Sequence, residues 1–145
     1  MGKNGGDRKK TFSNGKERYI SCMLQLLSFL LLYVLSITIL KELYLFRWTA
    51  DNRYLYLWIF VLILSVFDKI PISLALTIGN VVGVLLGQFI GDEIRYRNIQ
   101  KITENMNLEQ RAYLHIHHGF TIWIVTVLVS FIVGVTIYTW GKKSK

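Results

Sequence analysis

Long apolar blocks separated by short polar segments dominate the chain. Three of these blocks contain no charged residue and are 21 or 22 residues long: Ile20–Leu40, Ile70–Gly91 and Gly119–Trp140. About 20 apolar residues are enough to cross a bilayer as a helix. In lipid, only helices and closed barrels satisfy their backbone hydrogen bonds, and uninterrupted apolar runs of this length indicate helices. The pattern predicts an all-α integral membrane protein.

A fourth apolar block, Tyr54–Phe67, has 14 residues and is short for a span. A helix of this length covers only about 21 Å. It can be extended back to Trp48, and local thinning of the bilayer absorbs modest mismatch. We therefore expect four transmembrane helices, one of them short, with a re-entrant segment as the alternative for the short one.

The polar segments divide the chain into three parts. Residues 1–18 hold six Lys or Arg, two acids and four glycines, a composition that predicts a disordered basic tail. Residues 19–141 form the helical membrane domain, and residues 142–145 form a basic C-terminal tail. With four spans or with three, ten Lys and Arg lie on the side of the N-terminus and seven on the other. The positive-inside rule thus places the N-terminus in the cytoplasm, and attraction of the tail to anionic headgroups is a second reading.

The segment 92–118 between the last two spans is expected to be amphipathic. It carries four acids and four bases, and its apolar residues keep roughly helical spacing, which predicts two short helices. Glu93 can pair with Arg97 one turn later. Asn107 followed by Gln110 resembles a capping box at the start of a helix.

Two shorter patterns lie at the two ends of the short apolar block Tyr54–Phe67. The first is a dense aromatic stretch, which we interpret as a loop in the membrane interface because Tyr and Trp prefer that depth. The second is Asp68 followed by Pro71, which indicates the start of a helix, since Pro is tolerated in the first turn and an acid suits its positive end. The aromatic residues are Tyr44, Phe46, Trp48, Tyr54, Tyr56 and Trp58.

In the block Ile70–Gly91, glycine recurs at every fourth position, at Gly79, Gly83, Gly87 and Gly91. Residues at i and i+4 share one face of a helix, so the four form a stripe of three overlapping GxxxG motifs, a glycine zipper. Each glycine costs roughly 1 kcal/mol against alanine in a helix interior, so the stripe needs a reason. In a bilayer, small residues at this spacing let two backbones approach closely. We predict that the stripe packs against another helix.

Polar residues next to the stripe, and small residues elsewhere, extend this prediction. Asn80 and Gln88 lie on the neighbouring stripe, where an amide in lipid needs a partner and would fix the register. Thr126, Ser130 and Gly134 repeat at the same spacing in the last block. The predicted partner of the glycine stripe is this last span or the same helix of a second copy.

The three histidines, His115, His117 and His118, are the weakest candidate site. A metal site is conceivable if Asp92 or Glu93 lies nearby, but the spacing matches no strong zinc pattern. A pH-sensitive contact and an ordinary headgroup-facing role are the alternatives. We predict no catalytic residue, no metal and no cofactor.

Known catalytic patterns are missing from the chain, which has no phosphate-binding glycine loop, HExxH, CxxC or GxSxG motif. The three long blocks contain no ionisable Asp, Glu, Lys, Arg or His, which argues against a proton-coupled carrier. In size and outline the chain resembles the small multidrug transporters, but these rely on an acid in the first span and Ile20–Leu40 has none.

We therefore expect a non-catalytic accessory or assembly subunit that acts through helix contacts. A homo-oligomeric small transporter or channel is the alternative, and a metal-dependent membrane enzyme using the histidines is a second one. The net charge of +8 is confined to the tails and loops, so no nucleic acid is expected. The expected partners are the lipid bilayer and either a second copy or another membrane protein.

Overall fold

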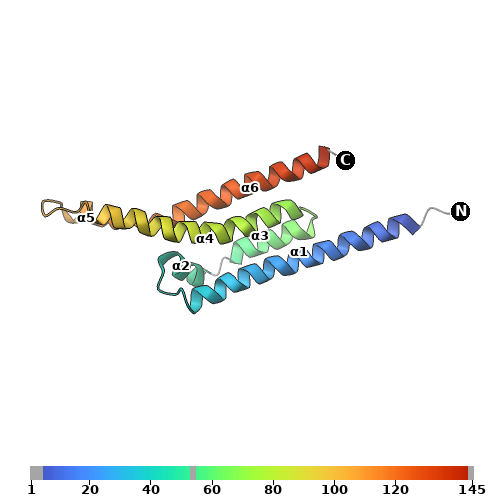
Figure 1. Ribbon diagram of the computed structural model, residues 1–145, viewed down its shortest axis with the longest axis horizontal. Coiled ribbons are helices and arrows are strands. Elements are labelled where there is room, and N and C mark those ends of the chain that lie inside the picture. The colour runs from blue at the N-terminus through green and yellow to red at the C-terminus, as the bar shows by residue number, and fades with distance from the viewer. Residues whose placement is uncertain (1–4, 53–54, 144–145) are drawn as a thin grey trace.

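The computed structural model describes residues 5–52 and 55–143, with side chains described from 15 to 52 and from 56 to 143. This part of the chain folds into helices joined by short connections (Figure 1). The helices are α1 (Gly5–Ile37), α2 (Tyr44–Asn52), α3 (Leu55–Val66), α4 (Ile70–Ile99), α5 (Leu108–Leu114) and α6 (Gly119–Lys143).

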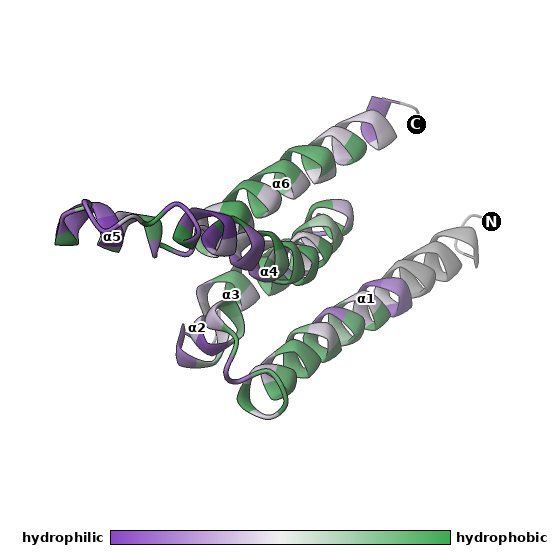
Figure 2. Cartoon of the chain, turned by 60° about the vertical axis from the view of Figure 1, so that its left-hand side comes forward, coloured by the Kyte–Doolittle hydropathy of each residue, from purple (hydrophilic) through white to green (hydrophobic). Residues whose placement is uncertain are grey.

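Three of the helices are long and apolar enough to cross a membrane. The qualifying stretches are Gly15–Ile37, Ile70–Ile99 and Gly119–Lys143. Helix α3 is also apolar, but its 12 residues extend only about 18 Å, against a hydrocarbon core of about 30 Å. Figure 2 shows apolar residues along α1 and α6 and hydrophilic residues around α5. The described part of the chain is thus all-helical, with three candidate spans and a shorter apolar helix where a fourth span was expected.

Helix α4 lies at the centre of the arrangement. In its most apolar 18-residue stretch, half of the residues are buried inside the protein. The corresponding share is 28% in α1 and 6% in α6. Helix α6 runs antiparallel along α4, while α1, α2 and α3 also contact α4 (Figure 1). The ends of the described chain lie at the same end of the molecule, and α5 projects at the opposite end.

Two apolar clusters join these helices. One contains Leu32 of α1, Leu45 and Phe46 of α2, and Val84 of α4. In the second, Phe29 packs against Trp58 with ring centroids 4.9 Å apart. Because lipid tails are as apolar as these side chains, such clusters stabilise the fold through dispersion contacts rather than by removal from water.

The turn between α3 and α4 is tied to both ends of the chain. Arg18 of α1 pairs with Asp68 at 3.4 Å, and the Lys69 ammonium donates to the Tyr138 hydroxyl of α6. Asp68 has a φ of 57°, in the left-handed region that Asp tolerates better than most residues. Lys69 occupies the N-cap position of α4 without a side-chain cap, and Pro71 follows in the first turn. Asp68 therefore makes the turn instead of capping the helix.

Several local predictions differ from the structure. Helix α1 begins at Gly5 and so includes part of the segment 1–18. The described part of the aromatic stretch is helical instead of a loop, with Tyr44, Phe46 and Trp48 in α2 and Tyr56 and Trp58 in α3. Residues 1–4 and 144–145 of the two tails, and Tyr54 of the aromatic stretch, lie outside the described residues.

The segment 92–118 contains one separate helix where two were predicted. Helix α4 continues through Ile99, so the first expected helix is its extension. Glu93 pairs with Arg97 at 2.6 Å, as predicted. The capping box is also confirmed, because Gln110 N donates to Asn107 Oδ1 at 2.8 Å and Asn107 N donates to Gln110 Oε1 at 3.1 Å.

Candidate functional site

The glycine stripe of α4 lies on the face that α6 covers. A Cβ atom built on Gly87 would lie 2.5 Å from the Gly119 carbonyl oxygen, and one on Gly91 would lie 2.8 Å from the Gly119 nitrogen. A Cβ on Gly83 would lie 3.0 Å from Trp123 Cδ1. A Cβ on Gly79 would overlap the Ser130 side chain. Each glycine stands where a larger residue would collide with its neighbour.

Helix α6 meets this face with its own small residues. A Cβ on Gly134 would lie 2.8 Å from Ala75 Cβ and 2.9 Å from Ile72 Cα. Thr126 Cβ lies 3.4 Å from the Cβ position of Gly83, and its hydroxyl donates to Ile122 O in its own helix. Together with Ser130 opposite Gly79, all three small residues singled out in the last span lie against α4 of the same chain.

Asn80 adds a polar contact to the same interface. Its side chain is completely buried, and its Oδ1 accepts a hydrogen bond from Trp123 Nε1 at 2.9 Å. Trp123 in turn packs against Trp48 of α2 and Phe120, with ring centroids 5.4 and 5.6 Å away. The amide therefore links α4 to α6 at a fixed height along both helices.

Gln88 links α4 to α2 instead of to α6. Its Oε1 accepts from the Leu45 backbone N–H at 2.7 Å. Leu45 lies in the first turn of α2, where backbone N–H groups have no partner within the helix. The Gln88 amide nitrogen donates to Asp92 Oδ2 at 2.5 Å. A side chain on the stripe beside the glycines thus caps a second helix and orients a carboxylate.

His117 completes this chain of hydrogen bonds just before α6. Its Nδ1 accepts from the Gly119 backbone N–H at 3.0 Å, so the ring proton resides on Nε2, which donates to Asp92 Oδ1 at 3.1 Å. The Tyr44 ring packs against the imidazole at a tilt of 32°, with centroids 4.3 Å apart. Desolvation by burial is the largest influence on the pKa of His117 and lowers it, while the hydrogen bond and the charge of Asp92 raise it, and the net shift is downward. The imidazole is therefore neutral at pH 7.

The other two histidines do not join it. His115 is exposed, and His118 is half-buried. Among the described residues, no group of three or more His, Cys, Asp or Glu side chains is placed to hold a metal ion. Asp92, one of the two acids that such a metal site would have required, accepts a hydrogen bond from His117.

A second buried polar cluster was missed by the sequence analysis. Gln25 of α1 donates to Ser21 at 2.8 Å and to Ser73 of α4 at 3.1 Å, and its Oε1 lies 3.1 Å from Ser65 Oγ of α3. Ser65 Oγ and Ser73 Oγ are 2.8 Å apart. The cluster joins three helices. Gln25 is the one amide within the uncharged block Ile20–Leu40, and this was the signal that could have identified it.

Comparisons with protein-family models, with curated protein sequences and with solved structures found no match. The proposed function therefore rests on the geometry of this chain.

Proposed function

We propose that the chain is a non-catalytic accessory or assembly subunit that binds another membrane protein through helix contacts. The glycine stripe, Asn80, Gln88 and the Gln25 cluster are all engaged within the chain, which supports a role for them in internal assembly. On this proposal the α4–α6 contact holds a preformed unit together, and the outer helices present its binding surface.

The surface of α1 carries the proposal. Leu24, Leu27, Leu31 and Val34 are exposed and recur at alternating intervals of three and four residues. This spacing forms the contact seam of left-handed helix pairs. Beside it, α1 and α4 leave an apolar groove of about 360 Å³, whose lining includes Leu27, Leu31 and Leu85. A partner helix could lie along α1 and place its large side chains in this groove.

We also propose that the chain crosses the membrane four times, with α2 and α3 together making the second crossing. Arg18 lies two residues before the first apolar block and is expected at headgroup depth, and its contact with Asp68 supports the same depth for the α3–α4 turn. Helix α3 reaches only part of the way from that turn, and α2 would cover the rest. The excess of Lys and Arg at this end supports a cytoplasmic location for both ends of the chain.

Extraction from native membranes tests the proposed function. The chain is isolated in a detergent-free polymer, and its complexes are weighed by native mass spectrometry. We expect one other integral membrane protein at fixed stoichiometry. Leu31→Trp should abolish the complex because the bulk of the ring falls within the proposed contact. Leu128→Trp is the matched control, since Leu128 is a similarly exposed leucine that lies on α6 and not on α1.

Two results would overturn the proposed function. A mass equal to the chain alone would show that the α1 surface faces lipid. A mass equal to several copies of the chain, reduced by Leu31→Trp, would favour the homo-oligomeric transporter or channel.

A further inference from the structure

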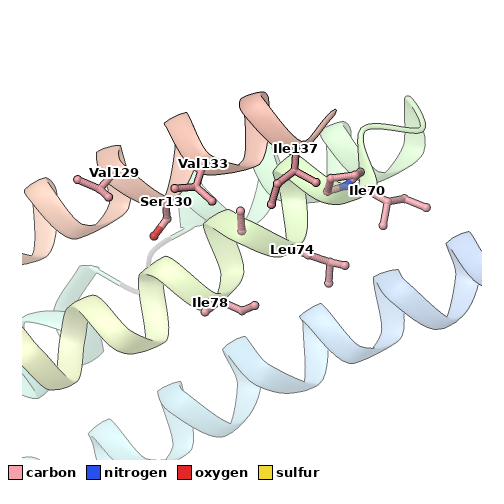
Figure 3. A pocket seen from close by; sticks show the side chains of 9 residues that line it. Ile70, Leu74, Ile78, Val129, Ser130, Val133 and Ile137 are labelled. Carbon is pink, nitrogen blue, oxygen red and sulfur yellow. The ribbon is translucent and has the colours of Figure 1, made fainter. Parts of the chain in front are cut away.

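An apolar groove lies between α4 and α6, toward the end of the molecule that holds both ends of the chain. Its volume is about 480 Å³, and eight of its nine lining residues are apolar, with Ser130 as the ninth. Ile70, Leu74 and Ile78 contribute from α4, and Val129, Val133 and Ile137 from α6 (Figure 3). Within each set of three, successive residues are four positions apart, which is about one helical turn. The groove therefore runs along both helices for about 12 Å.

The width of the groove favours a single acyl chain over a protein helix. At its floor the two helices touch, because a Cβ on Gly134 would lie only 2.8 Å from Ala75 Cβ. A helix with its side chains is about 10–12 Å across. It could rest on the rim but could not enter a space bounded by helices that are in direct contact.

The mouth of the groove is polar and carries basic side chains. A second cavity shares Ile70, Pro71 and Ile137 with the groove and is also lined by Tyr138 and Lys142. The ammonium groups of Lys69 and Lys142 lie 4.1 and 5.7 Å from the Tyr138 ring centroid. A phosphate placed at the mouth would meet these two ammonium groups within reach of a phenol hydroxyl.

Acidic residues at the mouth do not cancel this charge. Glu17 and Asp68 also line the cavity, but Asp68 is paired with Arg18 at 3.4 Å. With Lys69, Lys142, Lys143 and Arg18 against these two acids, the net charge at this end of the groove is positive. Each basic residue near a membrane surface contributes about 1 kcal/mol of attraction to anionic lipid.

We propose that the groove between α4 and α6 binds one acyl chain of an anionic phospholipid, whose phosphate lies at Lys69, Lys142 and Tyr138. The lipid belongs to the leaflet at the end of the molecule where both ends of the chain lie. This site is separate from the α1 surface to which we assign the protein partner.

Native mass spectrometry of the purified full-length chain tests the site. The detergent sample contains equal amounts of phosphatidylglycerol and phosphatidylcholine with identical acyl chains. We expect the chain to retain phosphatidylglycerol preferentially. Lys142→Gln should weaken phosphatidylglycerol binding about fivefold, which corresponds to about 1 kcal/mol, and should leave phosphatidylcholine unchanged. Lys101→Gln, an exposed lysine near the opposite end, should change neither.

A second pair of variants tests the groove itself. Val133→Phe should remove binding of both lipids because the ring fills the groove. Val125→Phe, at a similarly exposed position of α6 outside the groove, should retain binding. The site is disproved if the wild type retains both lipids equally, if Lys142→Gln behaves like Lys101→Gln, or if Val133→Phe retains lipid. Lys142 is exposed, so its variant decides the question even if Val133→Phe folds poorly. Leu31→Trp should leave lipid binding intact, which separates this result from that of the proposed function.

Discussion

Gly87 and Gly119 bring the backbones of α4 and α6 into direct contact. A Cβ atom on Gly87 would lie 2.5 Å from the Gly119 carbonyl oxygen, and one on Gly119 would lie 2.6 Å from the Gly87 carbonyl oxygen. The relationship is reciprocal, so neither glycine can be enlarged without moving the other helix. In a bilayer, such close approach is a main source of helix association.

Alanine substitutions of the stripe glycines should destabilise the protein to different degrees. The loss should be largest where the new methyl group meets rigid backbone and smaller where it meets a movable side chain. Gly87→Ala meets backbone and should lower the free energy of unfolding by about 1–3 kcal/mol, the usual range for overpacking. Gly83→Ala meets the Trp123 side chain at 3.0 Å and should be milder, because a side chain can shift. Thermal unfolding in detergent measures both. Gly141→Ala is the control, since nothing lies within 4 Å of its Cβ position. Equal midpoints for all three would contradict the ranking.

Ser73→Ala should destabilise the junction of α1, α3 and α4. The Ser73 hydroxyl contacts Gln25 and Ser65, and its loss leaves their buried groups short of a partner. Polar contacts between membrane helices contribute about 0.6–2 kcal/mol, so a loss in this range is expected. Ser28→Ala is the matched control, because that hydroxyl donates to Leu24 O in its own helix. Thermal unfolding midpoints that move equally in the two variants would show that the cluster adds nothing.

Low pH should destabilise the connection between α5 and α6, which His117 holds against Asp92 of α4. Burial lowers its folded-state pKa below the ordinary value of 6.5, so the folded state binds fewer protons than the unfolded state. The stabilisation from neutral His117 is therefore complete above pH 6.5. It declines as the pH falls through the folded-state pKa, with a slope of at most about 1.4 kcal/mol per pH unit.

His117→Gln isolates this contribution. Thermal unfolding between pH 8 and pH 5 should show a smaller acid-induced loss in this variant than in the wild type. His115→Gln should keep the wild-type pH profile, because His115 is exposed. The groups that face His117 are Asp92, Arg95, His118 and Tyr44, and none is altered in either variant. Parallel profiles for His117→Gln and the wild type would exclude a role for its burial.

Single cysteines test the four crossings. In a Cys22→Ser background, Lys16→Cys and Phe67→Cys should react with an impermeant maleimide from the same side of sealed vesicles. Lys101→Cys should react from the other side, because α5 and the end of α4 project from the opposite end of the molecule (Figure 1). Labelling of Lys16→Cys and Lys101→Cys from one side would instead support three spans with a re-entrant α3.

The structural features predicted correctly from the sequence are those that depend on residues close together along the chain. Uninterrupted apolar blocks located the three long helices, and the residue types at Asn107 and Gln110 identified a capping box. The fourfold glycine spacing marked one face of α4. It could not choose between α6 and a second copy, because both would present small residues to that face.

The remaining features depend on contacts between distant segments. Gln25 meets Ser65 and Ser73 only after α1, α3 and α4 assemble. Spacing alone could not distinguish His117 from its neighbours, because its burial comes from Tyr44 and Asp92 in other helices.

A disulfide across the α4–α6 interface tests the central claim, that the glycine stripe is occupied by the last helix of the same chain. Gly83→Cys and Thr126→Cys are combined with Cys22→Ser and oxidised in native membranes. The two Cβ positions are 3.4 Å apart, close to the 3.5–4.5 Å typical of disulfides. Val82→Cys with Thr126→Cys is the control, since Val82 lies about 100° round the helix. We predict a rapid crosslink within single chains for the first pair and none for the second. Crosslinked dimers, or equal reaction of both pairs, would contradict the claim.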